Sequence, residues 1–154
     1  MIVYNFHASN TILSRAIRAC SDGKFSHVSI WVDGYIYEAH IKEGVRKYKA
    51  NWSDADDIVE SIYIEFSKED EKRVKKFLNA QVGKKYDLFG VLSFIWFFLR
   101  PKDGQWFCSE YAMVSYMKLL TIKSCNYDQK QSPFGFYLMI KTIQNAKNLY
   151  KPDL

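Results

Sequence analysis

The dipeptide Asp33-Gly34 constrains the fold of this 154-residue chain more than any other short feature. It separates two segments, residues 26–32 (SHVSIWV) and 35–40 (YIYEAH), in which apolar and polar side chains alternate. Alternation with a period of two is typical of a strand, and Asp-Gly between two such segments favours a tight two-residue turn. The sequence therefore predicts a β-hairpin over residues 26–40.

The tight turn also predicts which hairpin residues face each other. Counting outward from it places Ser29 opposite Glu38 and His27 opposite His40. Opposed residues share a face of the sheet, and His27 shares the face of Ser29 by alternation. Glu38 is therefore diagonal to His27 and within reach of it, so an imidazole and a carboxylate are expected to meet.

His27 and Glu38 are together a candidate general base and its hydrogen-bond acceptor. A histidine that acts as a general base needs an acceptor on its second ring nitrogen, which fixes the tautomer and stabilises the imidazolium. Glu38 is the candidate acceptor for His27. A half-buried strand histidine bonded to the backbone is the alternative, and these residues alone leave both interpretations open.

A thiol completes the set of candidate groups. Cys108 lies in residues 105–120 (QWFCSEYAMVSYMKLL), where a helical pattern follows the turn at Asp103-Gly104. At a helix start, unpaired backbone N–H groups and the helix dipole favour a thiolate over a thiol. A thiol that packs as a small hydrophobe is the alternative. Glu110, in the same turn, is expected to stabilise the helix N-terminus by its charge.

Further elements follow from capping residues and periodicity. A helix over residues 11–20 is expected with Ser9 or Asn10 as its cap, and a third strand over residues 61–66. Ser67 is expected to cap a charged helix up to about residue 82, with a buried stripe formed by Val74, Phe77, Leu78 and Val82.

Two more helices are expected nearer the C-terminus. The apolar run over residues 88–99 (LFGVLSFIWFFL) predicts a largely buried helix that ends before Pro101. A turn at Pro133 should be followed by a helix from about Phe136.

Composition restricts the class of protein. The length fits one domain over residues 1–154, and 48% hydrophobic residues are enough for a core. Three separated cysteines, Cys20, Cys108 and Cys125, favour neither a disulfide framework nor a closed zinc site, which indicates a reducing compartment. No secretory signal is visible and the longest apolar run is too short to span a membrane, so a cytoplasmic location is expected.

A net charge of +5 permits anionic partners, including an anionic lipid surface. The basic residues are spread along the chain and no nucleic-acid motif is present, so no nucleic acid is expected.

The order of the short motifs resembles a known superfamily. Phe25-Ser26-His27-Val28, Tyr37-Glu38-Ala39, residues 83–87 (GKKYD) and Phe107-Cys108-Ser109-Glu110 follow one another in that order. In this respect the chain is similar to the circularly permuted branch of the NlpC-type papain-like cysteine hydrolases. These are the YiiX/YebB-like proteins, relatives of the lecithin:retinol acyltransferase and PPPDE groups. The likeness extends from about residue 9 to residue 133.

The resemblance implies an α+β fold of the circularly permuted papain-like type, with an antiparallel sheet packed against helices. It further implies that Cys108 is the nucleophile, His27 the base and Glu38 the third member of a triad. The histidine precedes the cysteine here, as permutation implies.

The expected function is that of a thiol hydrolase or acyltransferase acting on a peptide, amide or lipid-ester substrate, without a cofactor. Cys108 would attack a carbonyl carbon and His27 would protonate the leaving group. The Cys108 backbone N–H would stabilise the oxyanion, with Tyr86 as a candidate second donor and substrate-binding residue.

Three alternatives remain open on the sequence. A metal site of His27, His40, Glu38 and a thiol lacks the short ligand spacings of a closed site, so no metal is expected. A binding module on the same fold would have no catalytic activity. A membrane-peripheral protein would use residues 95–99 (IWFFL) with Arg100 and Lys102 to touch a bilayer.

Overall fold

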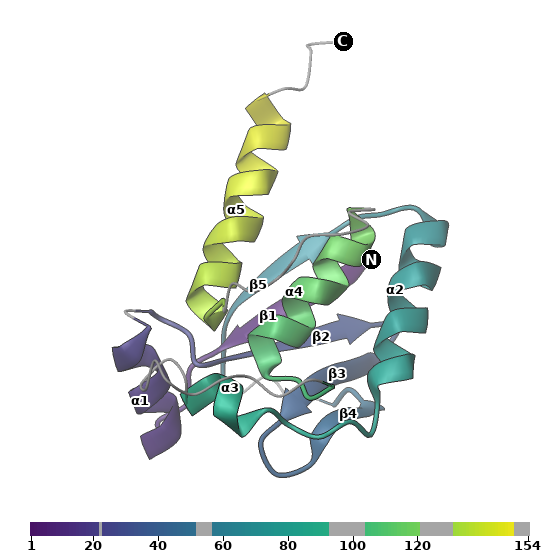
Figure 1. The fold of residues 1–154 in the computed structure, drawn as a ribbon. Coiled ribbons are helices and arrows are strands. Elements are labelled where there is room, and N and C mark those ends of the chain that lie inside the picture. The colour runs from purple at the N-terminus through teal and green to yellow at the C-terminus, as the bar shows by residue number, and fades with distance from the viewer. Residues whose placement is uncertain (22, 52–56, 93–103, 121–130, 150–154) are drawn as a thin grey trace.

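The computed structural model describes residues 1–21, 23–51, 57–92, 104–120 and 131–149. Five strands form one sheet: β1 (Ile2–His7), β2 (His27–Val32), β3 (Tyr35–His40), β4 (Gly44–Lys49) and β5 (Ile58–Ile64). Their order across the sheet is β4-β3-β2-β1-β5, and every neighbouring pair is antiparallel (Figure 1). The α+β class and the antiparallel sheet predicted above are therefore confirmed.

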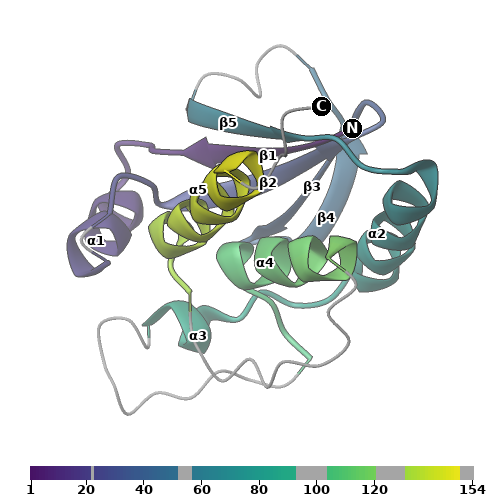
Figure 2. The ribbon, with the colours of Figure 1, turned by 90° about the horizontal axis from the view of Figure 1, so that it is seen from above.

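Within the described ranges, five helices accompany the sheet: α1 (Ile12–Cys20), α2 (Lys68–Gln81), α3 (Leu88–Leu92), α4 (Cys108–Leu119) and α5 (Pro133–Leu149). Helices α2, α4 and α5 lie on one side of the sheet (Figure 2). Helix α4 contacts β2 and β3 as well as both neighbouring helices. It is therefore the central helix of the layer, and its first residue lies close to the strands of the predicted hairpin.

The core lies between the sheet and this helical layer. Tyr4 on β1 packs edge-to-face against Tyr116 on α4 and Phe136 on α5, and its hydroxyl lies 2.9 Å from the Ser115 hydroxyl. Edge-to-face aromatic pairs stabilise by about 0.5–1.5 kcal/mol beyond burial alone. The largest fully buried side chains include Tyr4, Tyr37, Tyr111, Tyr116, Phe6, Phe25 and Phe136. This aromatic core fixes the position of α4 on the sheet.

The hairpin turn has the geometry that its sequence predicts. Asp33 and Gly34 both have positive φ, 48° and 76°. Two central residues with positive φ define the type I′ turn, which matches the twist of the strands on either side. Pairing runs from Val32–Tyr35 to Ile30–Tyr37, and the paired ladder between β2 and β3 ends there. The predicted backbone opposition of His27 and His40 is therefore not part of the ladder.

Two strands were not predicted from the sequence. Strand β1 is almost wholly buried because it lies between β2 and β5. Its sequence therefore lacks the regular alternation of apolar and polar residues that marks a strand with one exposed face. Strand β4 is at the edge of the sheet and carries charged residues, which are common on edge strands because they discourage pairing with other chains. The strand predicted over residues 61–66 is part of the longer β5.

Helix boundaries also differ in detail from the sequence prediction. Thr11, rather than Ser9 or Asn10, caps α1, because its hydroxyl accepts the Ser14 N–H at 3.2 Å. Ser67 caps α2 as predicted. Helix α5 begins at Pro133 instead of Phe136, since proline lacks an N–H that the first turn would leave unpaired in any case.

One burial prediction was wrong, and another is tested only in part. Val82 is 42% exposed because it follows the last residue of α2 and lies outside the stripe of Val74 and Leu78. In the described start of the apolar run, Leu88 and Phe89 are 41% and 40% exposed, whereas Val91 is buried. The rest of that run, with residues 95–99, lies outside the described residues. No helix in the described ranges is long and apolar enough to cross a membrane.

Candidate functional site

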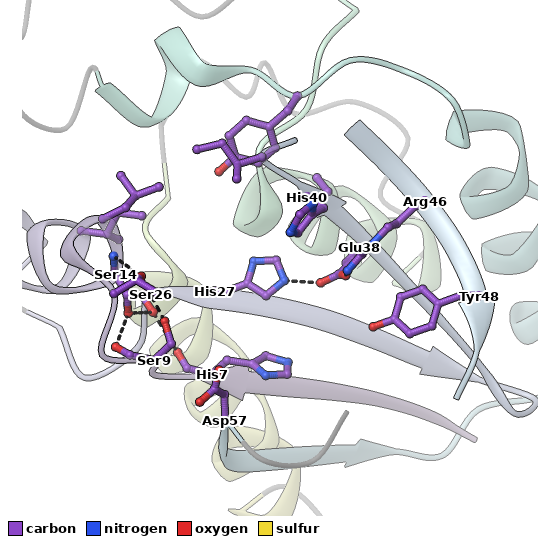
Figure 3. Close-up of a pocket in the computed structure, with 16 residues that line it drawn as sticks. His7, Ser9, Ser14, Ser26, His27, Glu38, His40, Arg46, Tyr48 and Asp57 are labelled. Atoms are coloured by element: carbon purple, nitrogen blue, oxygen red, sulfur yellow. Dashed lines mark hydrogen bonds and ion pairs between the residues drawn. The ribbon is translucent and has the colours of Figure 1, made fainter. Parts of the chain in front are cut away.

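The predicted contact between His27 and Glu38 is present, although the β2–β3 ladder ends at Ile30–Tyr37, before these residues. His27 is the first residue of β2 and Glu38 lies near the end of β3. The Nε2 atom of His27 lies 2.5 Å from Oε2 of Glu38, and the two side chains point toward one another (Figure 3). Glu38 is only 5% exposed, so this hydrogen bond is shielded from water.

The other oxygen of Glu38 is held by a residue that the sequence analysis did not single out. Arg46 on β4 is the direct cross-strand partner of Glu38. It donates from Nε and Nη2 to Oε1 of Glu38, at 2.8 Å and 2.5 Å. Its Nη1 donates to Glu43 at 2.8 Å. The guanidinium therefore lies between two carboxylates.

Cys108 approaches His27 from the helical layer. It is the first residue of α4, it is buried, and it lies close enough to the His27 imidazole to raise the pKa of that ring. Since Nε2 of His27 is occupied by Glu38, Nδ1 is the ring nitrogen left for the thiol. One imidazole thus links the helix-start thiol to the strand carboxylate.

The electrostatics of the three groups favour charge separation. Burial alone would lower the pKa of His27, but the neighbouring Cys108 and the hydrogen-bonded carboxylate of Glu38 raise it to about 10. Burial likewise opposes ionisation of Glu38, yet His27 and Arg46 lower the pKa of Glu38 to about 2. An imidazolium beside the ionised carboxylate of Glu38 is therefore the stable form of His27 at neutral pH.

A cavity of about 410 Å³ opens beside these residues. His27, Glu38, Arg46 and Tyr86 line it, together with residues of β1 and α1. Figure 3 shows His7 and Asp57 on one side of His27, and Ser9, Ser14 and Ser26 near α1. A small substrate can therefore reach the imidazole.

The predicted substrate-binding residue Tyr86 lies on the wall of this cavity. Burial and the neighbouring Cys108 raise the pKa of the Tyr86 hydroxyl well above its usual value. The phenol therefore stays protonated and keeps a hydrogen to donate. Its position on the cavity wall makes the hydroxyl available to a bound substrate.

Two further histidines line the same cavity. His7 on β1 pairs with His27 across the sheet, and its Nε2 lies 2.8 Å from the Ser29 hydroxyl. Burial and the charge of His27 lower the pKa of His7 to about 3. Burial and Arg46 lower the pKa of His40. Both rings therefore favour the neutral form at neutral pH, unlike His27.

Glu110 differs in part from its predicted role. Burial and the nearby Asp87 raise its pKa to about 7, opposed by a hydrogen bond with the Phe107 backbone. Its Oε2 atom is buried and has no hydrogen-bond partner among the described residues. Glu110 lies in the first turn of α4, as predicted, but with a pKa of about 7 its carboxyl is only partly charged at neutral pH.

Within the described residues, no three histidine, cysteine, aspartate or glutamate side chains gather as metal ligands would. Cys20 is exposed at the end of α1, away from the histidine, and Cys125 lies outside the described residues. His7 and Arg46 are the site residues that sequence reasoning missed. Alternation along residues 2–7 and charge on the strand after His40 were the available signals.

Comparisons with protein-family models, with curated proteins and with solved structures find no match for this chain. The chemistry of the site is therefore argued from its own geometry.

Proposed function

We propose that this chain is a thiol hydrolase, or an acyltransferase of the same mechanism, that acts through Cys108, His27 and Glu38. The observation that carries this proposal is the position of His27. Its ring hydrogen-bonds to the buried carboxylate of Glu38 and lies beside the helix-start thiol of Cys108, which raises the pKa of the ring. Covalent acyl transfer requires a nucleophile, a base beside it and an acceptor that orients the base, and the three side chains are arranged in that order.

The first step forms an acyl-enzyme. The Cys108 thiolate forms a bond to the carbonyl carbon of the substrate, and the carbonyl π electrons move to oxygen. The tetrahedral intermediate then expels an amine or alcohol, which takes a proton from Nδ1 of His27. A thioester on Cys108 and a neutral His27 remain.

The second step releases the acyl group. Neutral His27 accepts a proton from water, or from an acceptor alcohol or amine, as that group attacks the thioester carbon. The C–S bond breaks and Cys108 leaves as a thiolate beside imidazolium His27, so the site returns to its starting protonation. Glu38 stays ionised throughout, because its pKa lies near 2.

The developing oxyanion has two donors close to the thiol. The Cys108 backbone N–H belongs to the first turn of α4, where no intrahelical acceptor exists. The Tyr86 hydroxyl, kept protonated by burial and by Cys108, is the second donor in this proposal. Fixed donors at the developing charge supply a large part of the rate enhancement in acyl transfer.

The circularly permuted papain-like fold is part of the same proposal. Its support is an antiparallel sheet that presents histidine before the cysteine helix in the chain, with that helix packed on the sheet. The substrate class is a peptide, an amide or a lipid ester. A cytoplasmic location, with or without an anionic lipid surface as partner, remains our proposal on the composition.

The proposed function is tested by trapping the acyl-enzyme. The protein is mixed with p-nitrophenyl acetate, quenched in acid at successive times, and mapped by peptide mass spectrometry. An acetyl group should accumulate on Cys108 and then decay. It should be absent from Cys108→Ala and retained in Cys20→Ala, the matched exposed-cysteine control. A protein that never acquires the acetyl group on Cys108 is a binding module.

A further inference from the structure

Arg46 is attached to the proposed triad in a way that an ordinary surface arginine is not. Two of its N–H groups converge on a single oxygen, Oε1 of Glu38, at 2.8 Å and 2.5 Å. The other oxygen, Oε2, is the one that bonds His27. Because Oε1 is anchored twice, the carboxylate is held from rotating, and Oε2 stays directed at the imidazole.

The sheet itself sets this arrangement. Glu38 and Arg46 are directly paired residues of β3 and β4, so their side chains leave the sheet on the same face. On the outer side, Glu43 accepts from Nη1 of Arg46 at 2.8 Å. The guanidinium is thereby fixed at both ends and has little freedom to leave Glu38.

A buried carboxylate needs such a partner. Glu38 is almost fully removed from water, which disfavours its charge. Arg46 remains 31% exposed and so keeps part of its own hydration while it compensates Glu38. Bidentate contacts of this kind are beyond a lysine, whose ammonium is a single point donor.

We infer that Arg46 is a positioning residue of the site, a fourth member that acts on His27 only through Glu38. This inference rests on the proposed function and adds to it the residue that keeps Glu38 ionised and oriented. Arg46 does not touch the reacting atoms in this account. The low pKa of Glu38, to which Arg46 contributes by hydrogen bonding and by charge, agrees with it.

The test measures alkylation of Cys108 by iodoacetamide from pH 4 to pH 9 in the full chain, residue by residue by mass spectrometry. Arg46→Gln removes both the paired hydrogen bonds to Oε1 of Glu38 and the positive charge. It should slow alkylation at neutral pH by roughly tenfold, within the range found for coupled neighbouring groups. The acid limb of the rate profile should also move to higher pH, since Glu38 then protonates more readily.

Arg46→Lys separates orientation from charge. Lysine keeps the positive charge but contacts Oε1 through one donor, so the acid limb should stay near its wild-type position while the neutral-pH rate falls. This variant also serves if Arg46→Gln folds poorly. Lys47→Gln is the matched control, because it removes one charge from the next residue of β4, which contacts Asn79 and two tyrosine rings instead of Glu38. It should leave the profile unchanged.

A double variant tests the route of the effect. In a Glu38→Ala background there is no carboxylate to position, so Arg46→Gln should slow alkylation no further. An unchanged profile in Arg46→Gln, or an equal slowing with and without Glu38, overturns this inference while the proposed function stands. A wild-type Cys108 no faster than the thiols of the unfolded protein overturns the proposed function, and the inference with it.

Discussion

His7 and His27 are paired residues of neighbouring strands with ring centroids 5.3 Å apart, yet their pKa values move in opposite directions. Burial and the charge of His27 lower the pKa of His7 to about 3. Cys108 and Glu38 outweigh burial at His27 and raise its pKa to about 10. Two imidazoles in one cavity thus have different charges, and the partners of His27 are the cause.

The low pKa of His7 predicts a pH-dependent stability. Its folded-state pKa lies below the value of 6.5 in the unfolded chain, so His7 binds a proton more readily once unfolded. Its contribution to stability is therefore complete above about pH 6.5 and falls as the pH drops toward 3.

Between pH 7.5 and pH 5, Tm should fall less in His7→Gln than in wild type, because glutamine does not titrate. Thermal unfolding at the two pH values measures this difference. His40→Gln is the comparison variant from the same cavity, and its half-exposed ring should give a smaller change. An identical loss of Tm in wild type and His7→Gln would contradict a neutral His7 in the folded protein.

Glu38 should differ from an ordinary surface carboxylate in its effect on Cys108. Glu38→Gln keeps a hydrogen-bond acceptor on the same face but removes the charge that stabilises imidazolium His27. Alkylation of Cys108 at neutral pH should therefore slow in Glu38→Gln and slow further in Glu38→Ala. The cost in the free energy of unfolding should stay within about 1–3 kcal/mol, as for one buried polar group.

His40→Ala is the control for Glu38, because His40 lies in the same cavity without contacting the imidazole nitrogen that Glu38 holds. It should have the smaller effect on alkylation. Equal rates in wild type and both Glu38 variants would remove Glu38 from the triad. A larger loss in His40→Ala that added zinc reverses would instead indicate a metal site.

Glu110 should make the fold less stable at alkaline pH. Its folded-state pKa of about 7 lies above the usual value of 4.5, so the folded protein favours the protonated form. The stability it contributes is present at low pH and is lost as the pH rises from about 4.5 through 7.

Glu110→Gln keeps an acceptor for the Phe107 backbone but carries no charge, so it should be more stable than wild type at pH 8 and little different at pH 4.5. The gain should be about 2 kcal/mol, less than the full shift implies because the side chain is partly exposed. Chemical denaturation at both pH values measures it. A variant less stable than wild type at pH 8 would contradict the buried carboxyl pair.

The local elements of the site were predictable because their signals are local. Asp33-Gly34 predicts the turn without knowledge of the rest of the chain, and the turn brings Glu38 near His27. The start of α4 at Cys108 likewise follows from the preceding turn and the helical pattern.

The remaining features depend on contacts between distant segments. Arg46 reaches Glu38 because β4 pairs with β3, and a charged edge strand has no strong pattern of its own. His7 enters the cavity only because β1 is inserted between β2 and β5. The protonation of Glu110 depends on Asp87, a residue that precedes it by more than twenty positions. Such pairings join segments that are distant in the chain, so the residues around each position do not identify its partner.

The most direct test of the central claim is the reactivity of the cysteines, measured one by one. The native protein is treated with limiting iodoacetamide at pH 7 and mapped by mass spectrometry, beside the same protein unfolded in urea. Cys108 should react fastest in the native protein, faster than Cys20 and Cys125, despite its burial. It should lose that advantage in His27→Ala and on unfolding. A native Cys108 that reacts no faster than in urea, or reacts equally in His27→Ala, would contradict a thiolate activated by His27.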